Sequence, residues 1–144
     1  QLDRPLPEFD LSPLPGTESG FSSQDLEGKV VLINVFASWC SVCRAEHDKL
    51  LDLAASQPVP VYGVNWKDAK GAGTLFLNRF GNPYIATGDD PAGVLGSQLG
   101  VTGVPETLVI DADGRIRYRH LGELTDEVWT GILQPLLSGL EAES

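Results

Sequence analysis

Two cysteines, Cys40 and Cys43, stand in the run WCSVC, where an apolar stretch gives way to a helical pattern. A disulfide between them would close a loop too short to restrict the unfolded chain much, so its value must be chemical. At a helix N-terminus, unpaired backbone N–H groups and the helix dipole stabilise a thiolate. The sequence therefore predicts a redox centre. Cys40 is the nucleophile, and Cys43 attacks the Cys40 sulfur to release a mixed disulfide.

Length and charge limit what else the chain could be. At 144 residues it can form one domain with a real hydrophobic core, which needs no cross-links to fold. Its 20 acidic and 10 basic side chains give a net charge of −10, which argues against binding to nucleic acids or anionic membrane surfaces. We find no signal peptide and no run of roughly 18–20 apolar residues that could span a membrane. Because the chain opens at Gln1 and has no methionine, we expect that its natural start was removed, which leaves room for a lost signal or N-terminal membrane anchor.

The two ends of the chain differ from its middle. Residues 1–29 are rich in Pro, Ser and Gly, which predicts an extended lead packed on the domain, with a short hairpin anchored by Phe9, Leu11 and Phe21. We expect the domain itself to span residues 30–138 and residues 139–144 to form a frayed, flexible tail.

The elements on either side of the cysteines predict a parallel sheet. Val30–Phe36 is apolar apart from Asn34, as expected of a strand in the middle of a sheet. Residues 40–56 have helical spacing, and 59–65 read as a second buried strand. Strand, helix and strand in this order form a crossover with parallel strands.

The second half of the chain continues the alternation of elements. We expect helices near residues 70–80 and 91–99, with a short strand at 84–87 between them. Residues 105–110 and 115–120 read as an antiparallel hairpin about the turn DADG, with the second strand at the sheet edge, and a last helix follows at 125–137.

This order of elements, with WCxxC after the first strand and an apolar Gly-Val-Pro before the hairpin, resembles the thioredoxin fold from Val30 onward. Five blocks are similar to the thioredoxin-like proteins of bacterial cytochrome c maturation, the CcmG or DsbE type: WCSVCRAEH (39–47), GVNWKD (63–68), GNPY (81–84), GVPET (103–107) and IRYRH (116–120). The resemblance implies an α/β thioredoxin fold with a central mixed β-sheet flanked by helices. It also implies an insertion around residues 67–90 and an extended N-terminal segment.

The resemblance also implies a function. Proteins of this family are periplasmic, tethered to the inner membrane and kept reduced by a membrane thiol transporter. They reduce a disulfide of apocytochrome c, or of a thiol protein in the maturation system. We therefore expect a monomer with no cofactor beyond the redox-active Cys40–Cys43 disulfide. Ser41-Val42 departs from the dipeptides usual between such cysteines, which leaves the redox potential open.

Glu46 and Asn34 are the polar residues expected beneath the cysteines. Glu46 falls on the helix stripe that faces the core, so its carboxyl should be desolvated with a raised pKa, and it could take the proton of Cys43. The alternative is a surface glutamate at the edge of the stripe. Asn34 stands where thioredoxin carries a buried acid, and we expect it to give hydrogen-bonding support under the site or to be purely structural.

The remaining expected site residues surround the sulfurs. Pro105 resembles the cis-proline that faces the CxxC pair in this superfamily, and Val104 would then offer strand-like hydrogen bonds to a substrate peptide. Glu106 either borders the same groove or is an ordinary carboxylate at a strand end. Trp39 either covers one side of the sulfurs or packs in the core.

A zinc site is one alternative use of the cysteines. Cys40, Cys43, His47 and His120 could supply four ligands. However, a second paired-ligand cluster is missing and a domain of this size folds without zinc, so we predict no metal.

Three further alternatives differ in chemistry. Covalent haem attachment needs a histidine directly after the second cysteine, where this chain has Arg44. A peroxidase on the same fold would carry threonine at the position of Ala37. A peptide-binding module with an inert CxxC, or a general periplasmic reductase outside cytochrome maturation, stays open on the residues alone.

Overall fold

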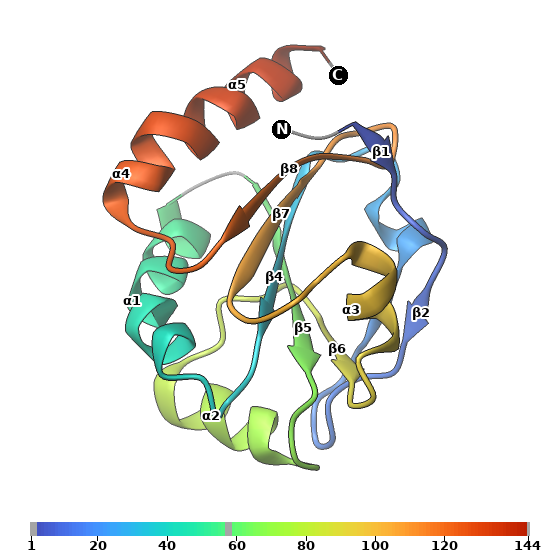
Figure 1. Cartoon of the computed structure of the whole chain (residues 1–144), viewed down its shortest axis with the longest axis vertical. Helices are drawn as coiled ribbons and strands as arrows, with labels where there is room; N and C mark the ends of the chain where they lie inside the picture. The colour runs from blue at the N-terminus through green and yellow to red at the C-terminus, as the bar shows by residue number, and fades with distance from the viewer. Residues whose placement is uncertain (1–2, 57–58, 144) are drawn as a thin grey trace.

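The computed structural model describes residues 3–56 and 59–143 (Figure 1). Its strands are β1 (Arg4–Pro5), β2 (Asp10–Leu11), β3 (Phe21–Ser22), β4 (Val31–Phe36), β5 (Val61–Trp66), β6 (Thr87–Asp90), β7 (Glu106–Ile110) and β8 (Arg115–Leu121). Its helices are η1 (Ser23–Leu26), α1 (Ser41–Ser56), α2 (Ala72–Phe80), α3 (Val94–Leu99), α4 (Asp126–Val128), the π-helical segment η2 (Trp129–Leu133) and α5 (Gln134–Glu143).

β4 lies inside a mixed sheet, as its apolar sequence predicted. The strand order is β1-β8-β7-β4-β5-β6; β4 runs parallel to β5 and antiparallel to β7. The C-terminal ends of β4 and β5 therefore meet at one edge of the sheet, and β7 begins beside them. This edge carries the loop that leads into Cys40.

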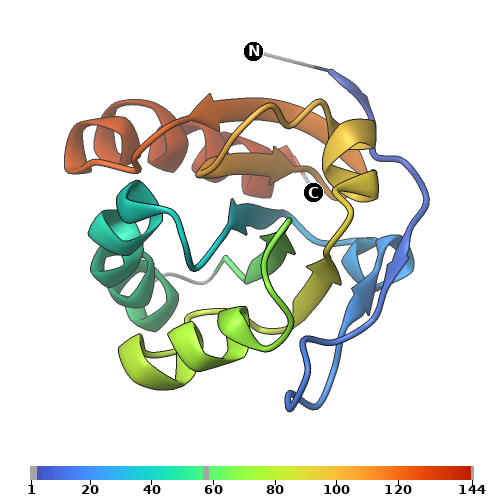
Figure 2. The ribbon, with the colours of Figure 1, turned by 60° about the horizontal axis from the view of Figure 1, so that its bottom comes forward.

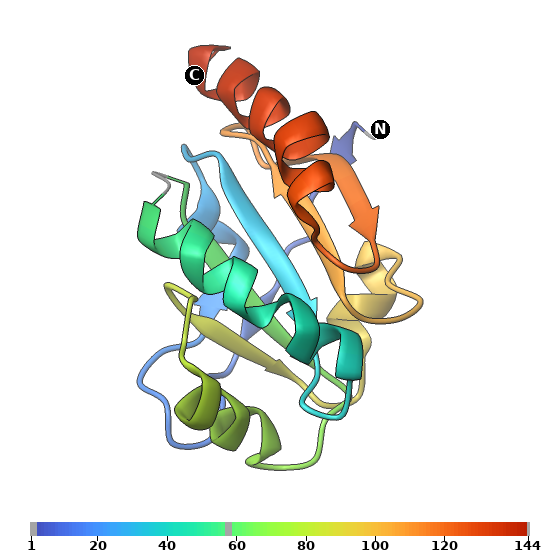
Figure 3. The same ribbon diagram turned by 90° about the vertical axis from the view of Figure 1, so that its left-hand side faces the viewer.

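Alternate residues of β4 enter two hydrophobic clusters, one on each face of the sheet. Leu32 and Phe36 belong to the cluster formed with α1, α2 and the C-terminal helical segments, and Val31, Ile33 and Val35 to the cluster formed with α3 and the N-terminal lead. Figure 3 shows α1 and the C-terminal helix over the same face of the sheet, and Figure 2 shows α3 and the lead on the far side from α1.

The N-terminal lead carries the predicted hairpin. β2 pairs with β3, Phe21 is buried, and Phe9 meets Phe21 edge-on with ring centroids 5.6 Å apart. Leu11 packs against the same cluster. β1 pairs with β8, so β8 is not the edge strand that its alternating pattern suggested.

Two element boundaries differ from the prediction. The strand expected at 84–87 begins at Thr87, because Tyr84 turns inward to the core and its N–H is bound by Asn82. The tail expected to fray from residue 139 instead continues α5 to Glu143, since Leu140 is buried in the core. Gln1, Leu2 and Ser144, which belong to the predicted lead and tail, lie outside the described residues. Within the described part of the chain, no helix has the length and hydrophobicity of a membrane span.

Candidate active site

Cys40 ends the loop after β4, and α1 begins at the next residue. Both cysteines are free thiols. The Cys43 N–H donates to the Cys40 sulfur at 3.1 Å, and the Cys40 thiol lies 3.6 Å from the Val104 carbonyl oxygen, to which it donates. Cys40 is 7% exposed and Cys43 only 2%. Cys43 therefore lies beneath Cys40 along the first turn of α1, and the outer sulfur is the one that solvent or a substrate reaches first.

Cys43 is held as a neutral thiol. Burial raises its pKa well above the usual range, and the neighbouring Cys40 sulfur and the negative charge of Glu46 raise it further. A thiol in this state needs a base before it can attack a disulfide.

The loop before β7 faces the sulfurs. The Val104–Pro105 peptide bond is cis, as predicted, and Val104 is partly buried against both hydrophobic clusters. Glu106, the first residue of β7, accepts the Thr102 N–H at 3.1 Å. Its other oxygen, Oε1, makes no hydrogen bond but lies 3.7 Å from the Arg119 Nε. Glu106 is buried, so its side chain fixes the loop from behind and does not line an open groove as one expectation had it.

The loop before Cys40 is fixed by Asp68, at the end of the neighbouring strand β5. The Asp68 carboxylate accepts the Ser38 N–H at 2.7 Å and the Ser38 hydroxyl at 2.8 Å. The Trp39 indole donates to the Lys67 carbonyl at 3.0 Å, and its ring is 59% exposed, which contradicts the alternative of core packing. The role of Asp68 was missed, although a polar residue just after a parallel strand that neighbours β4 is a signal that could have found it.

Glu46 is buried on the core side of α1, and the surface alternative is wrong. Its Oε1 accepts the Leu124 N–H at 2.8 Å, and its Oε2 accepts the Asn34 amide at 3.0 Å. The pKa of Glu46 rises from 4.5 to about 7, because the effect of burial outweighs that of the two hydrogen bonds, which lower it. This carboxyl is therefore poised to gain or lose a proton near neutral pH.

Asn34 connects Glu46 to the sheet, as the prediction of hydrogen-bonding support required. Its side-chain N–H₂ also donates to the Thr107 hydroxyl at 3.2 Å, and its carbonyl oxygen accepts the Tyr84 hydroxyl at 2.7 Å. All these groups are buried. Thr107 and Tyr84 were missed as site residues because their hydrogen bonds to Asn34 join segments far apart in the chain.

The two histidines of the zinc alternative have other partners. His47 contacts the Gly81 carbonyl through Nε2 at 2.7 Å, and His120 contacts the Glu123 carbonyl at 2.9 Å. The described residues contain no cluster of three or more His, Cys, Asp or Glu side chains arranged to hold a metal.

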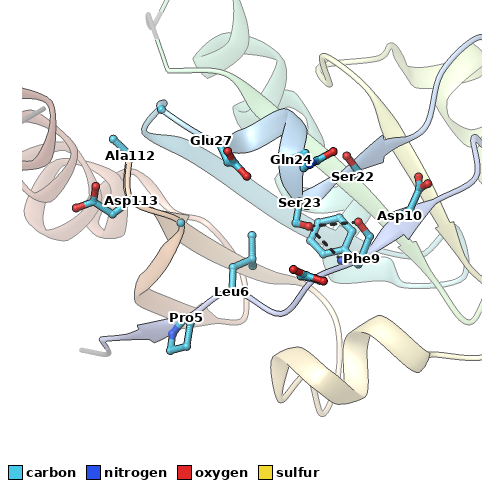
Figure 4. A pocket seen from close by; sticks show the side chains of 13 residues that line it. Pro5, Leu6, Phe9, Asp10, Ser22, Ser23, Gln24, Glu27, Ala112 and Asp113 are labelled. Atoms are coloured by element: carbon cyan, nitrogen blue, oxygen red, sulfur yellow. Dashed lines mark hydrogen bonds between the residues drawn. The ribbon is translucent and has the colours of Figure 1, made fainter.

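Two cavities differ in their relation to this site. One of about 410 Å³ lies between α1 and the segment before α4, and Glu46, Lys49, Glu123 and Leu124 are among the residues that line it. The larger, of about 830 Å³, lies between the N-terminal lead and the β7–β8 turn (Figure 4). Its lining includes Leu6, Phe9 and Asp113 but no predicted site residue, whereas the smaller cavity reaches Glu46.

The CxxC pair at the start of α1 has a cis-proline opposite it and a buried carboxyl beneath it. Together with a mixed sheet that helices cover on both faces, this arrangement defines a thiol-disulfide oxidoreductase of the thioredoxin type. The Redoxin family model matches residues 1–131. The thiol:disulfide interchange protein DsbE of Yersinia pestis is 46% identical over 136 residues, which cover 94% of this chain and 72% of that protein. The Vibrio cholerae DsbE is 42% identical over 143 residues, which cover 99% and 77%.

Solved structures agree with the sequence relatives. The protein of Chlorobium tepidum described as a thiol:disulfide interchange protein DsbE superposes with a TM-score of 0.75 at 26% identity, over 96% of each chain. A protein of Neisseria meningitidis described as a thioredoxin gives a TM-score of 0.80 at 25% identity, over 96% of this chain and 91% of that one. The chain belongs to the DsbE family of thioredoxin-like thiol:disulfide interchange proteins.

Proposed function

We propose that this oxidoreductase is a periplasmic reductant of c-type cytochrome maturation, acting on a disulfide of apocytochrome c or of a thiol protein of the maturation system. The observation that carries the proposal is the burial of Cys43 beneath Cys40 beside Glu46. Membership of the DsbE family and the five sequence blocks of the maturation proteins support it.

The direction of the exchange depends on how well the reduced cysteine pair is stabilised. A dithiol protein is a strong oxidant when its reduced form is stabilised. Here burial, the Cys40 sulfur and the Glu46 carboxylate all oppose ionisation of Cys43. Cys43 therefore stays a neutral thiol in the reduced pair, and the reducing direction of the proposal rests on the resemblance to the maturation proteins.

The exchange proceeds in two steps. The Cys40 thiolate attacks one sulfur of the substrate disulfide, which forms a mixed disulfide and releases the other substrate sulfur as a thiolate. Cys43 then gives its proton to Glu46, and its sulfur attacks the Cys40 sulfur. The mixed disulfide breaks, the second substrate thiolate leaves, and the chain is left with a Cys40–Cys43 disulfide. A membrane thiol transporter returns two electrons to complete the cycle.

The surface around Cys40 suits an extended, partly apolar peptide. Trp39 is 59% exposed and Val42 40%, and both flank the outer cysteine in sequence. Val104 offers backbone groups beside the Cys40 sulfur. Glu106 and Asp68 contribute indirectly, since they hold the loops that carry Val104 and Trp39.

We extend the proposal to the setting of the reaction. The chain acts as a monomer, without a bound cofactor, in the periplasm of a bacterium, and a segment outside this chain tethers it to the inner membrane. The resemblance to the maturation proteins supports this setting.

Trapping by variants tests the proposal. Reduced Cys43→Ser chain, mixed with an oxidised peptide that carries a haem-attachment CxxCH motif, should accumulate a covalent adduct because no resolving thiol is present. Cys40→Ser is the matched control and should form none. Mass spectrometry of the unreduced mixture reads the result. Absence of the adduct in Cys43→Ser contradicts the order of attack. If the wild type reduces unrelated disulfide peptides as fast as the CxxCH peptide, a general reductase is favoured instead.

A further inference from the structure

Tyr84 brings a hydroxyl group into the centre of the molecule from the segment between α2 and β6. This hydroxyl is buried and donates to the Asn34 carbonyl oxygen at 2.7 Å. Asn34 in turn donates to Glu46 at 3.0 Å. Two hydrogen bonds thus connect Tyr84 to the Glu46 carboxyl, to which we assign proton transfer. The exchange described above gives Tyr84 no role.

The Tyr84 hydroxyl decides which end of the Asn34 amide faces Glu46. A side-chain amide has an accepting oxygen and a donating nitrogen, which exchange places when the amide flips. While Tyr84 donates to the oxygen, the nitrogen faces the Glu46 Oε2 and the Thr107 hydroxyl. Burial raises the pKa of Tyr84 well above its usual range, so the hydroxyl keeps its proton for this bond.

The ring of Tyr84 is held so that its hydroxyl has little freedom. It stacks on Phe36, with ring centroids 5.1 Å apart and ring planes 24° apart. The ring also lies against Gly63 of β5, where an added Cβ would come within 2.7 Å of it. Asn82 fixes the backbone through the Tyr84 N–H at 2.9 Å. A glycine in the middle of a buried strand is explained by this close approach.

We propose that Tyr84 is a positioning residue for Glu46: its hydroxyl holds the Asn34 amide in the orientation that donates to the carboxylate. This inference rests on the proposed role of Glu46 as the proton acceptor of Cys43. Without the hydroxyl, the Asn34 oxygen would be a buried acceptor with no partner, and a flip would turn it toward Glu46. An oxygen there can accept only from the protonated carboxyl, so the flip favours the acid form.

Tyr84→Phe tests the proposal directly. We expect the titration midpoint of the Glu46 carboxyl to move up by about one pH unit, the size expected for loss of one buried hydrogen bond to the charged form. The readout is the infrared carboxylate band as a function of pH, assigned by its absence in Glu46→Gln. The pH profile of the rate at which the chain resolves a mixed disulfide should lie at higher pH in Tyr84→Phe than in the wild type, by the same amount.

Tyr62→Phe is the matched control. Tyr62 is also a buried tyrosine, but it belongs to the cluster on the other face of the sheet, and its hydroxyl lies 3.4 Å from the Lys29 amine. Its loss should lower stability without moving the Glu46 midpoint. A merely structural role of Tyr84 would give the same result as this control.

A second variant guards against a Tyr84→Phe chain that fails to fold. Gly63→Ala keeps the hydroxyl but displaces the ring, and should move the Glu46 midpoint upward as well. A midpoint that stays at the wild-type value in a folded Tyr84→Phe or Gly63→Ala chain overturns the proposal. If instead Glu46→Gln leaves the rate profile unchanged, the proton role of Glu46 fails, while the infrared midpoint still decides the positioning role of Tyr84.

Discussion

Glu46 on α1 and Glu106 at the start of β7 are both buried, but their chemical surroundings differ. The donors to Glu46 are neutral: the Leu124 N–H and the Asn34 amide. Glu106 accepts the Thr102 N–H and also has a guanidinium, Arg119, 3.7 Å away. Burial raises the pKa of both carboxyls, but the Arg119 charge opposes the rise at Glu106.

The difference between them separates two uses of a buried acid. Glu46, which has no cationic partner among its hydrogen-bond donors, gains and loses its proton near neutral pH and lines a cavity beside α1. Where a cation opposes that rise in pKa, as Arg119 does at Glu106, the carboxyl serves to hold a loop. Glu46 is therefore fitted to exchange protons, whereas Glu106 is fitted to keep the Val104 region in place.

The largest expected effect is on the pH dependence of stability. The pKa of Glu46 is about 7 in the folded chain, against an ordinary value of 4.5, so its contribution to stability is fully present below pH 4.5 and is lost as the pH rises through 7. Over that range the wild type should lose about 3 kcal/mol of unfolding free energy relative to Glu46→Gln. Urea titrations of both chains at each pH measure the difference.

Glu106→Gln is the control for that experiment. Arg119 opposes protonation of Glu106. Removing the Glu106 carboxyl should therefore change the slope of unfolding free energy against pH less than removing the Glu46 carboxyl does. Equal slopes for the two variants would break the comparison between the two acids.

The next effect is on the rate of resolution. Glu46→Gln removes a base, and we expect the step in which Cys43 attacks the mixed disulfide to slow by roughly 30- to 100-fold at neutral pH, near the lower end of general-base effects. Its dependence on pH around 7 should flatten as well. Stopped-flow measurement of tryptophan fluorescence follows the step. In Glu106→Gln the resolution rate should persist and the KM for substrate peptide rise instead, and the reverse pattern would exchange the two roles.

Much of this arrangement could be predicted from the sequence, because it depends on local signals. The apolar run of β4 indicated a central strand, and the CxxC spacing indicated the redox pair. Glu46 was predicted to be buried because its place on the helix stripe follows from the 3.6-residue period alone. Its neighbour Asn34 could be predicted as a supporting residue because it interrupts an otherwise apolar strand.

The rest depends on contacts between segments far apart in the chain. Tyr84 was expected in a strand, but its ring packs against Gly63 and Phe36, and only the tertiary packing of the three decides that. The burial of Glu106 likewise depends on Arg119 in the paired strand β8 and on a turn at Thr102. Local patterns do not encode such partners, so the sequence left the role of Glu106 open.

The smallest effect expected here comes from making one acid resemble the other. Arg119→Met removes the cation beside Glu106 and two hydrogen bonds to the carbonyl groups of Leu99 and Gly100, at 3.2 and 3.0 Å. We expect a loss of about 2 kcal/mol in unfolding free energy above neutral pH, since a buried carboxylate is left without its cationic partner.

The loss in Arg119→Met should shrink as the pH falls, because protonation of Glu106 removes the unpaired charge. Arg117→Met is the matched control: Arg117 has similar exposure on the same strand but pairs with Asp111 at 3.1 Å. It should leave the titration of Glu106 unchanged. If Arg119→Met is destabilised equally at every pH, the charge of Arg119 matters less than its two hydrogen bonds, and the contrast between Glu46 and Glu106 must come from their neutral donors alone.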